Sequence, residues 1–208
     1  MTEIKLEKDK TNESKKSKPF FLEIKDFSLE TIKVVIVSLI VIVGIRSFVM
    51  QPFFVDGKSM EPNFYDGDYL IVDEISYKFW EPRRGDVIIF HYPLDTREFY
   101  IKRIIGLPGE KIEIKDNKII IYNNENKDGM IINENIYIPE SATTLGNYAK
   151  ELKNDEYYVL GDNRSASSDS RFWGVVKKHF IVGRAWIRAW PFNDFSVFES
   201  LEYGSLEK

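Results

Sequence analysis

The sequence predicts a mostly β domain that follows a single N-terminal transmembrane helix. Three observations predict this fold class. Residues 34–45 carry no charged side chain, and the chain beyond residue 67 is a succession of short β-branched and aromatic runs separated by turn residues. The length of 208 residues suffices for one membrane segment and one domain of about 150 residues. A second full domain is not expected.

Residues 1–28 and 29–50 are expected to form two different segments. Residues 1–28 are dominated by Lys, Glu, Asp, Ser and Asn, which predicts a flexible tail. Residues 29–50 are the predicted anchor, because a helix from residue 34 to residue 50 would span about 26 Å. A buried helix of a soluble protein is one alternative, although the segment is apolar on every face. A cleaved secretory signal is another, but no small-x-small cleavage site follows the apolar run.

The lysines around the anchor predict its orientation. Eight lysines precede the apolar run, whereas only Arg46 and Lys58 follow it shortly afterwards. Because basic flanks stay inside the cell, residues 1–28 are expected in the cytoplasm and residues 51–208 on the extracytoplasmic face. The predicted location is therefore the cell membrane, with a single pass and the lipid bilayer as a partner.

The domain beyond the anchor is predicted to be built from short strands. Turn residues divide seven runs of strand character, at residues 68–73, 86–90, 100–105, 111–114, 118–122, 157–160 and 181–190. Asp116 and Asn117 indicate a hairpin turn, and residues 175–180 fit either a helical turn or a short strand. Residues 123–154 lack a clear period and are predicted to form an exposed excursion from the sheet.

Composition removes several classes of function. The net charge is −4, and the basic residues are scattered without an aromatic platform, so nucleic acid is not an expected partner. The absence of cysteine excludes a disulfide framework, a cysteine nucleophile and thiolate metal sites. With only His91 and His179 present, a histidine metal site is not expected either. We expect neither a metal nor an organic cofactor.

Ser59 and Lys102 are the candidate reactive residues. Ser59 lies in a short turn, residues 56–62, in which Gly57 can adopt unusual backbone angles and Pro62 stiffens the exit. The blander interpretation is an ordinary turn serine. Lys102 lies within an apolar strand, and burial would lower its pKa from about 10.4 to about 8 at a cost of roughly 3 kcal/mol. A neutral amine could then deprotonate the serine, whereas an exposed strand lysine could not.

A polar loop at residues 161–171 is the third candidate element. It contains two acids, two arginines and four serines, and a solvated surface loop is its simplest interpretation. Asp162 is expected to pair with Arg103, which points away from Lys102 on the same strand and would fasten the loop behind the site. Ser167 is expected to exchange a hydrogen bond with the Lys102 amine.

Together these stretches resemble a known family. The matching motifs are Ser59-Met60-x-Pro62, Arg84-Gly85-Asp86-Val87, Lys102-Arg103-Ile104-Ile105-Gly106-Leu107-Pro108-Gly109, and Gly161-Asp162-Asn163-Arg164 with Ser167, Asp169, Ser170 and Arg171. In this order, behind a membrane anchor, they resemble bacterial type I signal peptidase from about residue 29 to about residue 191. The chain departs from the family at Gly57, where some members carry a hydroxyl that helps to bind the oxyanion, and at Asn63-Phe64, which replaces the commoner Thr-Leu.

The resemblance implies a role for each matching residue. Ser59 would be the acylated nucleophile and Lys102 the general base, with Ser167 positioning the lysine. Asp162, Asp169 and Arg171 would hold the loop. The implied fold is the β catalytic fold shared with self-cleaving repressor peptidases. The implied activity is cleavage of exported preproteins after a small-x-small motif in their signal peptides, with the secretion translocon as an indirect partner.

The walls of the substrate pocket are predicted from the residues that flank the dyad in sequence: Phe53, Val55, Met60, Phe64, Tyr100 and Ile101. Narrow apolar pockets would admit alanine and reject larger side chains. Two other functions stay open. A repressor-type Ser-Lys autoprotease would carry a DNA-binding module in place of the tail and anchor, and an inactive membrane-anchored β binding module would need neither Ser59 nor Lys102.

Overall fold

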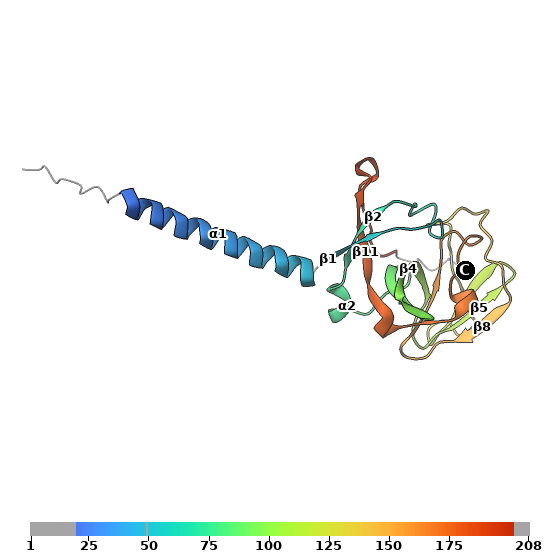
Figure 1. Cartoon of the computed structure of the whole chain (residues 1–208). Helices are drawn as coiled ribbons and strands as arrows, with labels where there is room; N and C mark the ends of the chain where they lie inside the picture. Colours follow the sequence, from blue (N-terminus) through green and yellow to red (C-terminus); the bar gives the residue numbers. More distant parts are fainter. Residues whose placement is uncertain (1–19, 49, 202–208) are drawn as a thin grey trace, which may run out of the picture. The chain divides into compact units, whose positions relative to one another are not determined.

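The computed structural model describes residues 20–48 and 50–201, and the chain divides into two compact units after Val43. Helix α1, Phe20–Phe48, contains the first unit's described residues (Figure 1). Its side chains at residues 28–42 are exposed. The helix begins earlier than predicted, so residues 20–28 are helical, while residues 1–19 of the expected tail lie outside the described residues. In the part of the chain that was described, no helix has the length and apolarity needed to cross a membrane.

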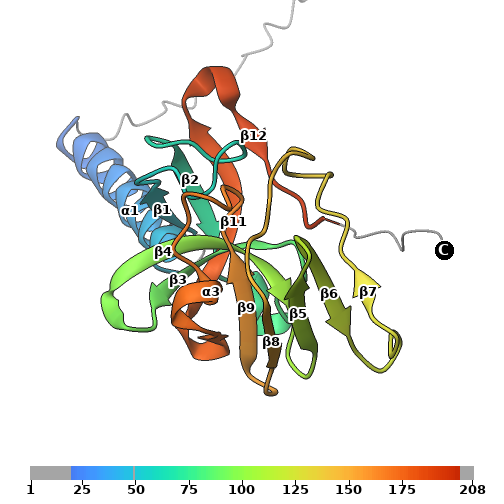
Figure 2. The ribbon, with the colours of Figure 1, turned by 90° about the vertical axis from the view of Figure 1, so that its right-hand side faces the viewer.

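The second unit is mostly β, as predicted, and its larger sheet contains eight of the described strands. Seven follow one another in the order β1-β2-β11-β3-β4-β9-β10, and β12 pairs with β11 (Figure 2). Each pairing in this sheet is antiparallel. The strands are β1 (Met50–Phe54), β2 (Tyr69–Asp73), β3 (Val87–Tyr92), β4 (Asp95–Gly106), β9 (Glu156–Leu160), β10 (Val176–Lys177), β11 (Ile181–Trp190) and β12 (Ser196–Val197).

The smaller sheet has four described strands in the order β7-β6-β5-β8. These are β5 (Lys111–Lys115), β6 (Lys118–Tyr122), β7 (Met130–Ile131) and β8 (Tyr148–Glu151). Asp116 and Asn117 form the predicted hairpin turn between β5 and β6, with φ angles of 50° and 61°. Two positive φ angles in a two-residue loop match the right-handed twist of the paired strands.

Short helical segments join the strands. They are α2 (Ser76–Phe79), α3 (Ser170–Trp173) and two 3₁₀ turns, Lys178–Phe180 and Phe192–Asp194. Residues 175–180 therefore contain both structures that the sequence left open, a two-residue strand followed by a helical turn.

The prediction that residues 123–154 are exposed is wrong for part of that segment. Ile132, Tyr137, Ile138 and Leu152 are buried in a core that also contains Leu160 of the larger sheet. Isolated apolar residues in a turn-rich segment have no period, so pattern analysis misses their burial. The segment therefore packs against a core that it shares with residues of both sheets.

Candidate active site

The loop between β1 and β2 presents Ser59. Two backbone hydrogen bonds close its base, from Val55 N–H to Asp68 O at 2.9 Å and from Gly67 N–H to Val55 O at 3.0 Å. Gly57 has a φ of +90°, an angle that favours glycine, and its N–H donates to Asp66 Oδ1 at 2.8 Å. The Gly57 amide is therefore already engaged. No group in the described chain accepts a hydrogen bond from the Ser59 N–H.

Neither Met60 nor Phe64 lines the cavity in front of Ser59, contrary to the prediction that they form its walls. Phe64 N–H donates to Met60 O at 3.0 Å, which makes one helical turn. Side chains four residues apart in such a turn share a face. Here that face is inward, because Met60 is 0% and Phe64 1% exposed. The buried Met60 and Phe64 anchor the turn that presents the half-buried Ser59.

Strand β4 brings Lys102 to Ser59. Lys102 Nζ donates to Ser59 Oγ at 2.8 Å and to the carbonyl oxygen of Ile101 at 2.8 Å. The side chain is buried, with 4% of Lys102 exposed, because β4 is an inner strand between β3 and β9. The two residues that the sequence singled out are thus in hydrogen-bond contact, although 43 positions separate them.

Burial lowers the pKa of Lys102 to about 8. Removal from water is the largest cause, since it disfavours the ammonium form. The carboxylates of Asp169 and Asp162 act in the opposite direction and raise the pKa, but neither is hydrogen-bonded to the amine. About a tenth of this amine is therefore neutral at pH 7, far more than in an exposed lysine.

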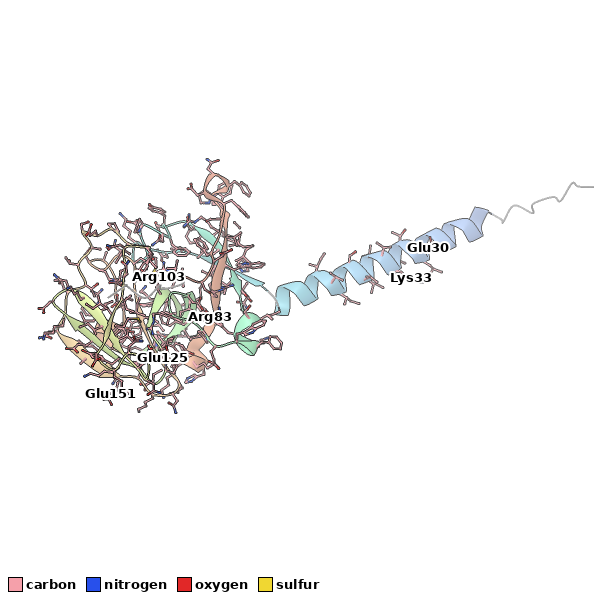
Figure 3. The ribbon with its side chains drawn as sticks, turned by 180° about the vertical axis from the view of Figure 1, so that it is seen from behind. Glu30, Lys33, Arg83, Arg103, Glu125 and Glu151 are labelled. Carbon is pink, nitrogen blue, oxygen red and sulfur yellow. The ribbon has the colours of Figure 1, made fainter. Side chains whose placement is uncertain are left out.

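Arg103 and Asp162 form the predicted ion pair on the other side of β4. Arg103 donates through Nε to Asp162 Oδ1 at 2.8 Å and through Nη2 to Oδ2 at 2.6 Å. It also donates to Gly85 O at 2.8 Å, and Asn63 Nδ2 donates to Asp162 Oδ2 at 2.8 Å. Arg103 lies inside the β unit (Figure 3). The two-point contact fastens the 161–171 loop to β4, one residue from Lys102.

Gly161 lets this loop touch the serine turn. Asn163 N–H donates to Ser59 O at 3.1 Å. A Cβ added at Gly161 would lie 2.2 Å from Ser167 Oγ and 2.5 Å from Ser59 O, so only glycine fits. Ser167 Oγ is buried and has no hydrogen-bond partner among the described residues. The expected bond between Ser167 and Lys102 is therefore not formed in this structure.

Asp169 and Arg171 brace the far end of the loop. Asp169 is the N-cap of α3, and its carboxylate accepts from Arg171 Nε at 2.8 Å and from Gly161 N–H at 3.1 Å. Arg171 Nη2 also donates to Arg164 O at 2.6 Å. The carboxylate thus ties both ends of the loop together, in a site where Asp169 is fully buried.

Residues 134–144 support the loop from outside, which the sequence did not indicate. Glu134 accepts from Arg164 Nη1 at 2.6 Å and Nη2 at 2.5 Å. Thr144 Oγ1 also accepts from Arg164, and the Tyr137 ring lies 4.4 Å from the Arg103 guanidinium carbon. Only contacts between distant segments reveal this cluster, because Glu134 stands alone in an irregular stretch. The predicted excursion is therefore part of the site's framework.

A cavity of about 370 Å³ lies in front of the dyad. Four predicted walls line it, Phe53, Val55, Tyr100 and Ile101, together with five apolar residues that were not predicted, Phe54, Leu70, Ile89, Phe99 and Ala166. Leu70, Ile89 and Phe99 reach the cavity through sheet pairing and not through nearness in sequence to Ser59. Across the described residues, no three His, Cys, Asp or Glu side chains come together as a possible metal site.

Comparisons with known proteins identify the family of this chain. The family model described as "Signal peptidase, peptidase S26" matches residues 28–190. A signal peptidase I from Leptolyngbya laminosa is 39% identical over 79% of this chain and 81% of its own length. A signal peptidase IB from Staphylococcus aureus is 33% identical over 80% of this chain and 92% of its own.

A solved signal peptidase I from Enterococcus faecalis is 28% identical and covers 50% of this chain and 97% of its own. Its TM-score is 0.41, and the fold assignment does not rest on it. The family match covers most of the chain, including every residue of the dyad and its loop. The chain therefore belongs to the type I signal peptidases of the peptidase S26 family and is a serine peptidase.

Proposed function

We propose that this protein is a membrane-anchored endopeptidase that removes signal peptides from exported preproteins, using Ser59 as nucleophile and Lys102 as general base. The observation that carries the proposal is the 2.8 Å contact between Ser59 Oγ and a lysine amine that is almost fully buried. A neutral amine at that position accepts the hydroxyl proton and donates one N–H to Ile101 O. Both contacts of the amine are then satisfied.

The proposed reaction is acyl transfer in two halves. Lys102 takes the Ser59 proton while Oγ attacks the scissile carbonyl, and the resulting ammonium gives that proton to the departing amine of the mature protein. Water then attacks the acyl-enzyme, with Lys102 again as base, and releases the signal peptide and the serine. The unengaged Ser59 N–H is a donor for the oxyanion in both halves.

The remaining site residues are proposed as supports. Asp162, Asp169 and Arg171 hold the loop against Ser59. Ser167 is the proposed positioning hydroxyl: its Oγ, without a partner in the described chain, has a free lone pair for the lysine amine. Exchange of that hydrogen bond during the reaction would keep Nζ aimed at Ser59.

The cavity beside the dyad is proposed to hold the small side chains that precede the cleavage site. Phe53, Tyr100 and Ile101 make up part of its apolar wall. A small-x-small sequence presents alanine-sized side chains to such a wall, whereas larger ones meet it by steric conflict. This agrees with signal peptides as the substrate class.

Helix α1 is proposed to anchor the enzyme to the lipid bilayer, with residues 1–28 in the cytoplasm and the β unit outside, near the secretion translocon. Large apolar side chains between Leu29 and Ile42 are exposed, and lipid is the solvent that such a surface suits. Fractionation and protease accessibility of the β unit in intact cells test the location. Recovery in the cytoplasm would favour a repressor-type autoprotease instead.

Ser59→Ala in the full chain tests the chemistry. Processing of an exported precursor should stop, while urea unfolding should change little because Ser59 is only half-buried and the change removes a single hydroxyl. Ser196→Ala, on β12, is the matched control and should retain activity. Undiminished processing by Ser59→Ala would leave an anchored binding module as the function.

The pH dependence tests the base. Since the pKa of Lys102 is lowered to about 8, the neutral fraction grows roughly tenfold per pH unit below that value. The kcat/KM for a signal-peptide substrate should rise with that slope and level off above pH 8. A profile that is flat from pH 6 to pH 9 would remove Lys102 as the base.

A further inference from the structure

A second cavity, of about 340 Å³, lies on the other side of the serine turn. Three segments line it: Glu61 and Pro62 of the turn, Asn163 and Ser165 of the polar loop, and Pro139 and Thr143 of the excursion. We name it the leaving-side pocket. The first cavity is lined by residues 56–59 of the turn and by Ala166 and Ser168 of the polar loop. Ser59 therefore lies between the two cavities.

The same two segments, the serine turn (residues 56–62) and the polar loop (residues 161–171), line both cavities. Along the serine turn, Gly57 lines the first cavity and Glu61 the second; along the polar loop, Ser168 lines the first cavity and Asn163 the second. The hydrogen bond from Asn163 N–H to Ser59 O, 3.1 Å long, joins the two segments at the point between the cavities. A chain that places its scissile carbonyl at Ser59 Oγ therefore has one cavity for each side of the bond.

Charge distinguishes the leaving-side pocket. Two further charged residues line it, Asp162 and Arg164, and each is neutralised by an ion pair, with Arg103 and Glu134 respectively. Glu61 is half-buried, and within the described residues its carboxylate forms no ion pair or side-chain hydrogen bond. The pocket consequently carries one uncompensated negative charge, two residues from the nucleophile.

We propose that the leaving-side pocket holds the first residues of the mature protein, and that Glu61 selects a basic residue there over an acidic one. This inference rests on the proposed function, since it assigns the half of the substrate that leaves during acylation. It also gives residues 139–143 a role, as the outer wall of a substrate site. Glu61 is here a specificity residue and takes no part in proton transfer.

Matched peptides test the proposal on the full chain in detergent. They share one small-x-small signal sequence and differ only in carrying Lys, Gln or Glu at one of the first three positions after the scissile bond. At low salt, kcat/KM should favour Lys over Glu by about three- to tenfold at one or more of these positions, the size expected of a partly exposed charge pair. Added salt should shrink the ratio.

Variants at residue 61 decide whether Glu61 is the cause. The Lys-to-Glu ratio should fall to about one in Glu61→Gln and invert in Glu61→Lys, because the charge is removed and then reversed. Glu125→Gln, an exposed glutamate outside this pocket and outside residues 139–143, should leave the ratio unchanged. Acyl-enzyme hydrolysis should be the same for every peptide, since the leaving half has already departed.

Each outcome bears on one proposal only. Cleavage of these peptides with a ratio near one at all three positions in the unmodified enzyme, or a ratio that Glu61→Lys leaves unchanged, would overturn the leaving-side assignment while the peptidase function stands. No cleavage of any peptide, with Ser59→Ala indistinguishable from the unmodified protein, would overturn the proposed function itself.

Discussion

Lys102 and Arg103 are neighbours on β4, yet only the buried region around Arg103 places a carboxylate in contact with the cation. Arg103 meets the carboxylate of Asp162 at 2.6 Å. Lys102 meets a hydroxyl and a peptide carbonyl, which are both neutral. Burial penalises either cation, but only the arginine has a carboxylate in contact to offset that penalty. The carboxylate stabilises the buried guanidinium, whereas Lys102, with only neutral acceptors in contact, has a pKa that burial lowers to about 8.

This difference shows how one strand can support both structure and chemistry. The Arg103 side is a permanent ion pair that fixes a loop, and the Lys102 side is a titratable amine aimed at a serine. The following four experiments exchange or weaken the groups that separate the two sides, starting with the largest expected effect.

Lys102→Arg replaces the titratable amine by a guanidinium like that of Arg103. A guanidinium keeps its proton throughout the working pH range, so cleavage of a signal-peptide substrate should fall by about 10³-fold or more. Lys111→Arg, an exposed lysine on β5, is the matched control and should be fully active. If Lys102→Arg kept a tenth of the activity, the amine would not be the base.

Asp162→Ala removes the carboxylate that distinguishes the Arg103 side. It leaves a guanidinium buried without its partner, so the free energy of unfolding in urea should fall by about 3–5 kcal/mol. The double variant Arg103→Met with Asp162→Leu should recover much of that loss, because no charge is then buried. If Asp162→Ala lowered the free energy of unfolding by less than about 1 kcal/mol, the Arg103–Asp162 ion pair would not be what holds the loop in place.

Lys102→Met removes the buried amine, and it should stabilise the protein while abolishing activity. The pKa of Lys102 falls from 10.5 to about 8 on folding, so the unfolded chain binds more protons between these values and stability rises with pH there. The stabilisation by Lys102→Met should therefore be largest at pH 8 and below and shrink by about 3 kcal/mol by pH 10.5. Urea unfolding of both proteins at pH 7.5 and pH 10.5 measures it. A constant difference would contradict the lowered pKa.

Glu134→Gln weakens the outer support of the loop with the smallest change. It keeps the shape of the side chain but removes its charge, and only one of the two oxygens that accept from Arg164 remains; the loss should cost about 1.5–3 kcal/mol in the free energy of unfolding. Glu140→Gln in the same segment is exposed and should cost almost nothing. Equal effects of the two variants would show that the Glu134 contact is not specific.

The strands, and the opposite orientations of Lys102 and Arg103 on β4, can be predicted from the sequence because both follow from the two-residue alternation of a strand. Alternation in β4 places Lys102 and Arg103 on opposite sides. The partner of Arg103, Asp162, stands in the polar loop, and the partner of Lys102, Ser59, stands in the serine turn. The unpaired Ser167 and the engaged Gly57 amide depend on loop geometry, to which no period applies.

Burial in irregular segments is where prediction from sequence failed. Met60 and Phe64 flank the nucleophile in sequence, but one helical turn sends both into the core. Glu134 and Tyr137 reach the site only because the smaller sheet folds back on the larger one. Contacts of this kind follow from tertiary packing, which a single sequence does not display.

The inner position of β4 has a consequence for how mutations can damage the enzyme. Both edges of the strand are hydrogen-bonded, to β3 and to β9, so sliding it would break two ladders at once. A slip of one position would turn the guanidinium toward the serine and the amine toward the aspartate, giving a protein with every functional group present and no working base. Deletions or insertions anywhere between Asp95 and Lys102 should therefore be far more harmful than substitutions at the same positions.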